Sequence, residues 1–361
     1  MLHRDAVQRT WMPCAACRTR RRTRQVTRQR PPSSIAVARL AGVSQSAVSR
    51  TFTPGGIVSP ATRARVLAAA EALGYRPNLL SRSLTTGRSG IVAVAVGGLS
   101  NPFHAMALES FASGLQRMGR QVMLVVVADE WALGSAVELL SGYQVDAVLS
   151  SLSVNAADVA DALTRFAVPI VTMNSSVTTR FVRTVAADDH GAGIAVAKHL
   201  HAQGARRFGY IAGRAGTLAQ ERREAGFRQG LAELGITQCA RAQGDHHHGG
   251  GCAAVRAMYG AARKTGSATG LDGLFCLNDL TAMGAIDTLR DAFGLRCPED
   301  VLVAGYDNVA ASAWPPYRLT TVDVGLDRIA EQAFALMEAA EGEPSEVLVT
   351  PQLVLRASTR R

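Results

Sequence analysis

Small apolar residues recur at helical spacing in two short segments near the N-terminus. The first segment is marked by Ile35, Val37, Ala38, Ala41 and Val43. Gly42 suits a left-handed turn that ends this helix, and Ser44 suits the N-cap of a second one. The inner face of the second helix carries Ala47, Val48 and Thr51 or Phe52. Two short helices joined by a tight glycine-containing turn are typical of a helix-turn-helix.

A third amphipathic segment completes this predicted head. Ser59 and Pro60 supply an N-cap followed by proline at the first helical position. The helix continues from Thr62 to Leu73 and stops at Gly74. Its inward residues are predicted to be Val66, Leu67, Ala70 and Leu73. We therefore expect a small all-α domain over residues 33–77.

The second helix presents four hydrogen-bonding side chains outward: Gln45, Ser46, Ser49 and Arg50. In a major groove, glutamine pairs with adenine and arginine with guanine through two hydrogen bonds each, while serine is less selective. A solvated polar face is the alternative interpretation. The position of these residues directly after the turn favours DNA recognition.

Past Gly90 the pattern changes to short β-rich runs that alternate with helical stretches, which is typical of parallel sheets with crossover helices. The predicted strands are Ile91–Val96, Val122–Val127, Val145–Leu149, Pro169–Met173, Arg207–Ile211, Gly273–Leu277 and Val301–Gly305. Ligands of open α/β sheets lie beyond the carboxyl ends of such strands. The loops that follow them, such as Asn278-Asp279, are therefore the expected place for a binding site.

Charge is concentrated at the N-terminus. Nine arginines and one acid, Asp5, lie within residues 1–32, so this stretch carries +8 of the formal charge of +10. Such a cluster is typical of a solvated tail or a phosphate-binding arm, and we predict a disordered extension over residues 1–32. A start of translation downstream of about residue 25 is the alternative.

Composition narrows the class of protein. No apolar run approaches the roughly 20 residues of a membrane helix and no secretory signal follows the arginines, so we expect a cytoplasmic protein without membrane contact. Free thiols are expected at Cys239, Cys252, Cys276 and Cys297. Neither the lone pair Cys14 and Cys17 nor the run Asp245–His248 offers a convincing set of ligands, and we predict no metal and no cofactor.

Three linked stretches of the head resemble the lactose/galactose repressor (LacI/GalR) family of transcription regulators. They are ARLAGVSQSAVSR (Ala38–Arg50), VSPATRARVLAAAEALGYRPN (Val58–Asn78) and SRSLTTG (Ser81–Gly87). The resemblance implies that bases are read by Gln45, Ser46 and Arg50. It implies that phosphates are held by Ser44, Ser49, Ser59, Thr62, Tyr75 and Asn78.

The resemblance also implies a hinge and linker over residues 78–89. Asn78 to Thr85 would form a hinge helix on operator DNA, with Leu84 inserted into the minor groove, where a bent duplex offsets the cost of unstacking. A plain linker residue is the alternative for Leu84. The family commonly has an acid where this chain has Ala36, so we expect weaker capping of the first helix.

The resemblance extends over the body, residues 90–361. Its motifs are Asn101-Pro-Phe103, Gly226-Phe227 after Arg223, Asn278-Asp279 with Ala282 and Gly284, Pro298-Glu-Asp-Val301, Gly305-Tyr-Asp307, Leu319-Thr-Thr321 and Pro351 to Thr359. It implies an α/β fold like that of the type I periplasmic binding proteins, with two lobes crossed by three strands. The N-lobe would cover about 90–186 and 323–348, and the C-lobe about 187–322 and 349–361.

A small-molecule effector is expected in the cleft between the lobes. The family's pocket positions correspond to His104, Asn174, Arg223, His246, Asn278 and Asp307. Arg223 and Asp307 suit sugar hydroxyls or a carboxylate, because both make directional charged hydrogen bonds. An ion pair between the lobes is the alternative for these two residues.

Two pocket positions and one position outside the predicted pocket depart from the family. His104 and His246 stand where relatives often carry an aromatic or apolar wall, and imidazoles there would meet an anionic or polar effector or simply provide stacking surfaces. Asp189 stands where the family usually has asparagine, which puts the local helix capping in doubt.

Two other classes of protein compete with this interpretation. A periplasmic solute-binding protein shares the body but lacks the DNA-binding head, and this chain shows no secretory signal. An enzyme is disfavoured because the chain has no GxxxxGK[ST], GxSxG or HExxH motif and no suggestive carboxylate pair. We therefore predict a transcriptional repressor that binds pseudopalindromic double-stranded operator DNA. We expect it to act as a homodimer, with a tetramer as the alternative, and to respond to a sugar or sugar acid.

Overall fold

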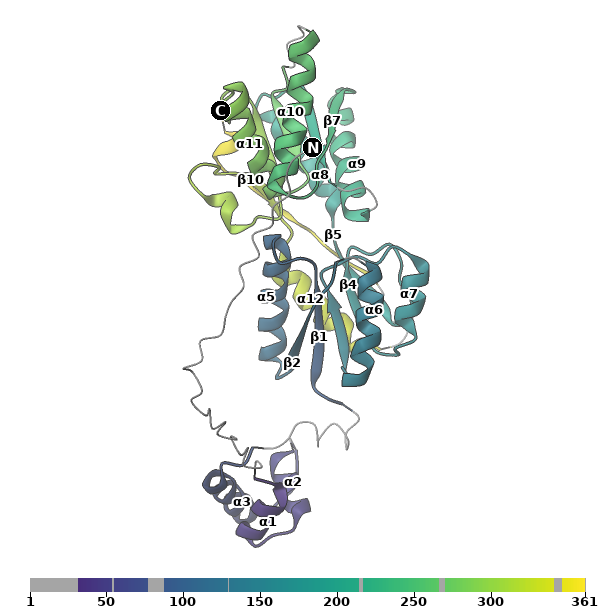
Figure 1. The fold of residues 1–361 in the computed structure, drawn as a ribbon, viewed down its shortest axis with the longest axis vertical. Coiled ribbons are helices and arrows are strands. Elements are labelled where there is room, and N and C mark those ends of the chain that lie inside the picture. Colours follow the sequence, from purple (N-terminus) through teal and green to yellow (C-terminus); the bar gives the residue numbers. More distant parts are fainter. Residues whose placement is uncertain are drawn as a thin grey trace, which may run out of the picture. The chain divides into compact units, whose positions relative to one another are not determined.

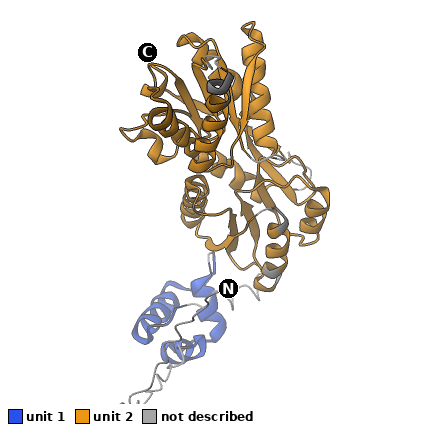
Figure 2. Ribbon diagram, turned by 45° about the horizontal axis from the view of Figure 1, so that its top comes forward, with its two compact units in different colours: residues 1–78 blue, residues 79–361 orange. Residues whose placement is uncertain are grey.

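The computed structural model describes residues 32–53, 55–76, 88–128, 130–213, 217–265, 270–340 and 346–360 of the chain. The chain divides into two compact units, residues 1–78 and 79–361 (Figure 2). The predicted N-terminal extension and the predicted contacts of Asn78 and Leu84 lie outside the described residues.

The first unit contains three helices within its described residues. They are α1 (Ser34–Ala41), α2 (Gln45–Phe52) and α3 (Pro60–Leu73). Each begins at a serine whose hydroxyl accepts a hydrogen bond from a backbone N–H of the first turn: Ser33, Ser44 and Ser59. Ser33 thus caps the helix for which Ala36 led us to expect weaker capping. Gly42 and Gly74 end α1 and α3 with left-handed backbone, as predicted.

A small core joins these helices. It consists of Val37, Ala38, Ala41, Val48, Val66, Ala69 and Ala70, with Val43, Phe52, Leu73 and Tyr75 packed against it. One predicted inward residue is wrong, since Leu67 is 47% exposed; Ile35, which marks the first helix, is 55% exposed. Arg63 ties α3 to the segments before it. Its guanidinium donates hydrogen bonds to the carbonyl of Thr51 in α2 and to that of Gly56 in the loop.

The second unit is built on two sheets, and the first is parallel throughout. Its strands follow the order β11 (Glu346–Val349), β5 (Val182–Ala187), β4 (Ile170–Met173), β3 (Ala147–Ser150), β1 (Ile91–Val96) and β2 (Gln121–Val126). One face is covered by α5 (Pro102–Arg117) and α12 (Leu326–Glu338), and the other by α6 (Glu130–Leu140) and α7 (Ala157–Thr164) (Figure 1).

The second sheet is mixed, because its edge strand β12 is antiparallel to β10. Its strands follow the order β12 (Gln352–Val354), β10 (Thr320–Asp323), β9 (Leu302–Tyr306), β8 (Gly273–Cys276), β6 (Phe208–Ala212) and β7 (Cys239–Gln243). Helices α8 (Asp189–Ala202) and α9 (Leu218–Glu233) pack on one face, and α10 (His248–Thr265) and α11 (Asp279–Phe293) on the other. Short 3₁₀ helices lie at Ser141–Tyr143, Ala310–Ala313 and Ala357–Thr359.

Three connections cross between the two lobes that these sheets form: β5 to α8, β10 to α12 and β11 to β12. Figure 1 shows β5 running from one lobe toward the other. The predicted fold, an all-α helix-turn-helix head followed by a two-lobe α/β body, is confirmed. None of the helices found in the described residues is both long and apolar enough to cross a membrane.

All seven predicted strands are present, with bounds shifted by no more than two residues. Five others were missed: β5, β7, β10, β11 and β12. The missed strands are short or carry polar residues, so their alternation of apolar and polar positions is weak.

Candidate functional site

A cavity of about 400 Å³ lies between the two lobes of the second unit. Its wall includes all six residues predicted to bind an effector: His104, Asn174, Arg223, His246, Asn278 and Asp307. Most of them follow the carboxyl ends of strands, and both lobes contribute. The chain therefore brings six polar side chains from distant parts of the sequence to one enclosed space of small-molecule size.

His104 forms part of the N-lobe wall. Its Nδ1 atom lies 2.9 Å from the Ser151 hydroxyl oxygen. Burial lowers the pKa of the imidazole below its usual 6.5, so the ring is uncharged near neutral pH. A side chain on Gly97 would place its Cβ 2.4 Å from the His104 ring, so the histidine needs a glycine there.

The side chains of Asn174 and Asn278 use most of their hydrogen-bonding capacity within the protein. The Asn174 side-chain oxygen accepts a hydrogen bond from the Ala187 N–H at 3.0 Å, where β5 leaves the N-lobe. The Asn278 side-chain oxygen caps α11 through the Thr281 N–H, and its amide donates to the His246 carbonyl at 3.0 Å. These two asparagines fix the shape of the wall and keep few hydrogen-bonding sites for a ligand.

Arg223 forms a buried ion pair, but within one lobe. Its Nη2 and Nε lie 2.7 and 3.2 Å from Asp189 Oδ1. Nη1 donates to the Leu277 carbonyl, and the guanidinium lies 3.2 Å from the centre of the Tyr306 ring. The ion pair between the lobes that the sequence left open for Arg223 is therefore not formed, and its partner is Asp189 of the same lobe.

Asp307 follows β9 with a left-handed backbone, φ +100°. Burial raises the pKa of its carboxyl to about 7, opposed by Arg223 and assisted by Asp189. Arg223 shifts in the opposite sense to what burial alone would cause. Burial would lower the pKa of its guanidinium, but the charges of Asp189, Tyr306 and Asp307 raise that pKa above its usual range. Arg223 is therefore a permanent cation, whereas Asp307 titrates near neutral pH.

Asp189 and Gln220 are polar residues of the cavity wall that were not among the predicted ligands. Asp189 is buried beside Arg223, and the doubt about capping is resolved by its neighbour: Asp188 accepts the Gly191 N–H at 2.9 Å and caps α8. Gln220 is 5% exposed, and its side-chain oxygen lacks a hydrogen-bond partner in the described structure. The departure from the family at Asp189 was the available signal; Gln220 gave none.

In the first unit, the four predicted base-facing residues of α2 are exposed: Gln45, Ser46, Ser49 and Arg50. Gln45 donates to the Ser34 hydroxyl at 3.0 Å and Arg50 Nε to the Ser46 carbonyl at 3.3 Å, contacts that water competes for and DNA can replace. The surface carries a net positive charge, since residues 32–76 hold five arginines and one acid, Glu71.

Of the predicted phosphate ligands that the structure describes, Ser44, Ser59 and Thr62 lie at helix starts, Tyr75 lies past the end of α3, and Ser49 is exposed in the middle of α2. Ser44 and Ser59 are exposed N-caps, Thr62 is half-buried beside Ser59, and Tyr75 is half-buried against Phe52 with ring centres 5.8 Å apart. Backbone N–H groups at helix starts favour anions.

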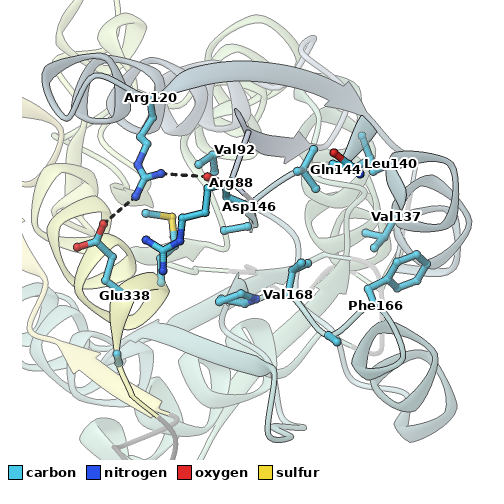
Figure 3. Close-up of a pocket in the computed structure, with 16 residues that line it drawn as sticks. Arg88, Val92, Arg120, Val137, Leu140, Gln144, Asp146, Phe166, Val168 and Glu338 are labelled. Atoms are coloured by element: carbon cyan, nitrogen blue, oxygen red, sulfur yellow. Dashed lines mark hydrogen bonds and ion pairs between the residues drawn. The ribbon is translucent and has the colours of Figure 1, made fainter. Parts of the chain in front are cut away.

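A second cavity, of about 910 Å³, lies in the N-lobe beside Arg88, where the chain enters the second unit (Figure 3). Asp146 is the centre of its polar wall. Its carboxylate accepts hydrogen bonds from the Ser89 N–H at 2.8 Å, the Ser89 hydroxyl at 3.0 Å and the Gly90 N–H at 3.0 Å. Arg120 lies 3.0 Å from Asp146 and 3.2 Å from Glu338, the last residue of α12.

Two family profiles match the chain. The profile described as bacterial regulatory proteins, lacI family, matches residues 36–78, and that of the periplasmic binding protein-like domain matches residues 197–359. The HTH-type transcriptional regulator CelR of Thermobifida fusca is 32% identical over 347 residues, covering 92% of this chain and 99% of that protein. The HTH-type transcriptional repressor PurR of Haemophilus influenzae is 29% identical over 337 residues, covering 90% and 97%.

Solved structures agree. A complex of the transcriptional regulator CelR with cellobiose is 29% identical, with a TM-score of 0.64, and the match covers 91% of this chain and 99% of that one. A lac repressor dimer bound to operator and an anti-inducer has the same fold, with a TM-score of 0.80 at 24% identity, and the match covers 92% of this chain and all of that one.

Proposed function

Since the chain belongs to the LacI family of DNA-binding transcription regulators, we propose that it is a repressor whose affinity for operator DNA is set by a small molecule bound between its lobes. The observation that carries this proposal is the convergence of six predicted polar residues on one cavity of about 400 Å³. The CelR complex with cellobiose supports a sugar or a related polar metabolite as the effector.

The first unit supplies the DNA contacts. Gln45, Ser46 and Arg50 would read base edges in the major groove, because they are exposed on a helix that directly follows the turn. Ser44, Ser49, Ser59, Thr62 and Tyr75 would hold phosphates, together with Asn78, and Leu84 would enter the minor groove. One such unit buries too little DNA surface for tight binding, so we expect a homodimer on a pseudopalindromic site.

A chain of hydrogen bonds supports coupling between the cavity and the linker. Asp307 is followed by Asn308, whose amide donates to Asp323 at 3.0 Å. The other Asp323 oxygen accepts the Gly325 N–H at 2.7 Å, directly before α12. Helix α12 has 13 residues, which corresponds to about 20 Å.

The far end of α12 reaches the residues that precede β1. Glu338 pairs with Arg120 and Arg120 with Asp146 (Figure 3). Asp146 in turn holds the backbone of Ser89 and Gly90. A change in lobe angle that moves α12 would therefore pull on the segment that leads to the DNA-binding unit. If effector and operator favour different lobe angles, each changes the affinity of the other by the same factor, typically 1–3 kcal/mol.

Regulation of transcription by binding to operator DNA implies a cytoplasmic location in a bacterium, and it requires no catalysis. We accordingly propose no enzymatic activity for the cavity, whose polar residues serve recognition.

Two measurements test the proposed function. Purified protein selects bound sequences from a random DNA pool, and a panel of metabolites is then screened for release of the selected duplex. We expect a pseudopalindromic consensus and at least one compound that changes the operator Kd. Equal binding to the selected duplex and to a scrambled competitor at moderate salt would contradict the regulator function.

A further inference from the structure

The interlobe cavity has an excess of carboxylates. Among the described residues of its wall, Arg223 is the single arginine or lysine, whereas Asp189, Asp245 and Asp307 are acidic. Three histidines also line the cavity, His104, His246 and His247, and burial lowers the pKa of the His104 imidazole, so that ring adds no charge near neutral pH. The cavity is therefore electrostatically unfavourable for an anion unless Arg223 is available to hold it.

The edge of Arg223 that would hold an anion is already occupied. A carboxylate or phosphate binds arginine best through two parallel N–H groups on one edge of the guanidinium. In this chain Nε and Nη2, which form such an edge, both donate to Asp189 Oδ1, at 3.2 and 2.7 Å. Nη1 donates to a backbone carbonyl, and Tyr306 covers a face of the group.

The remaining polar atoms of this part of the wall accept hydrogen bonds. Gln220 Oε1 is buried and has no hydrogen-bond partner within the described chain, whereas the buried carboxylate of Asp189 lies against the Tyr306 hydroxyl. Gln220 lines the cavity and is 5% exposed. A buried acceptor without a partner is costly, so the Gln220 oxygen calls for a donor from a ligand or from water.

We propose that Asp189 is a specificity-determining residue: by neutralising Arg223 it excludes anionic effectors and selects uncharged or cationic molecules rich in hydrogen-bond donors. This inference rests on the proposed function of the cavity. It removes the sugar acids from the candidate effectors and retains polyhydroxylated molecules and their amino derivatives. Hydroxyl or ammonium groups would satisfy Gln220 and Asp307, whereas a carboxylate would meet Asp245, Asp307 and a guanidinium already paired with Asp189.

Inorganic phosphate is a suitable probe, because it reports on the charge of the cavity whatever the natural effector is. Binding is measured by calorimetry and thermal shift on the full-length protein at constant ionic strength. The variants are Asp189→Asn, which keeps the shape and removes the charge, and Asp245→Asn, which removes a cavity charge that does not contact Arg223. The double variant Asp189→Asn/Arg223→Met shows whether the guanidinium is responsible.

We expect no saturable phosphate binding by the wild type, and an affinity at least tenfold higher in Asp189→Asn than in either the wild type or Asp245→Asn. The double variant should lose this gain. Equal gains in the two single variants, or no gain in Asp189→Asn, would overturn the proposal.

A second measurement keeps the proposal testable if Asp189→Asn does not fold. Wild-type protein that binds phosphate in an Arg223-dependent, saturable way contradicts it directly. Release of operator DNA by galactose and galactosamine but not by galacturonate, or by the corresponding gluco series, supports it. Failure of every metabolite to change operator binding would instead refute the proposed function, while the phosphate titrations would still decide the role of Asp189.

Discussion

Replacing Arg120 with methionine should uncouple the effector cavity from DNA binding while leaving both sites intact. Arg120 is the link between Asp146, which holds Ser89 and Gly90, and Glu338 at the end of α12. Methionine keeps the apolar part of the side chain and removes both ion pairs. The substitution lies in the second cavity, away from the residues that line the effector cavity.

The structure bounds the size of this effect. The Arg120–Asp146 pair is mostly buried, with side-chain exposures of 22% and 14%, and a hydrogen bond to such a charged group contributes about 1.5–3 kcal/mol. Glu338 is 54% exposed, so its pair with Arg120 contributes about 0–1 kcal/mol. Because the two contacts act in series, coupling that passes through them cannot exceed the weaker one, and we expect a loss of up to about 1 kcal/mol, or roughly fivefold in the effector-induced change of operator Kd.

The assay is fluorescence anisotropy of the selected operator duplex, with and without saturating effector. Arg117→Met is the matched control, because Arg117 is an exposed arginine at the end of α5, three residues before Arg120, and its side chain has no ion pair with a described residue. By linkage, the effect of DNA on effector affinity, measured by calorimetry, must shrink by the same factor. If Arg120→Met retains the wild-type ratio of operator Kd values within about twofold, the route through α12 is wrong.

Three further outcomes are expected. Arg50→Ala should weaken operator binding by about 1–3 kcal/mol and relax the preference at one base per half-site, whereas an unchanged profile across randomised sites would exclude base reading by Arg50. Because the pKa of Asp307 is raised to about 7, the free energy of unfolding of the ligand-free protein should rise as the pH falls through 7. A donor-rich effector binds the ionised carboxylate, so its affinity should fall over the same pH range. Asp307→Asn should flatten both pH profiles, as followed by urea unfolding and calorimetry. Gly226→Ala should cost about 1–3 kcal/mol in urea unfolding, since the added Cβ would lie 2.0 Å from the His190 carbonyl oxygen, whereas Gly260→Ala, with open space around it, should be neutral or stabilising.

The sequence predicted the fold because its strongest signals are local. Serine caps, left-handed glycines and apolar strands such as Ile91–Val96 act through neighbours in the chain, and the structure has them. Strand β5 was missed because Arg183 breaks its apolar pattern. Arg183 is buried nonetheless, since its guanidinium donates to the Leu336, Ala339 and Ala340 carbonyls at the end of α12, more than 150 residues away.

The same limit applies to the cavity. The positions of its wall residues followed from resemblance, but their hydrogen-bond partners did not, because each partner comes from a distant segment. Arg223 and Asp189 are 34 residues apart, and no local pattern pairs them. Leu67 shows the converse error, since helical spacing placed it inward while only packing decides that it is 47% exposed.

Among the three crossings between the lobes, the one from β10 to α12 is the best placed to convert lobe closure into a pull on the linker. At this crossing Gly325 has φ +72°, a left-handed conformation, and its N–H is held by Asp323. Beyond it lies a rigid helix whose last carbonyls are fixed by Arg183 and whose last side chain pairs with Arg120. The crossing from β5 leads instead into α8, and that from β11 into the edge strand β12, so neither ends near Ser89 and Gly90. A rotation absorbed at Asp323 and Gly325 would therefore be transmitted along α12, because hydrogen bonds hold both of its ends while its middle packs against the sheet.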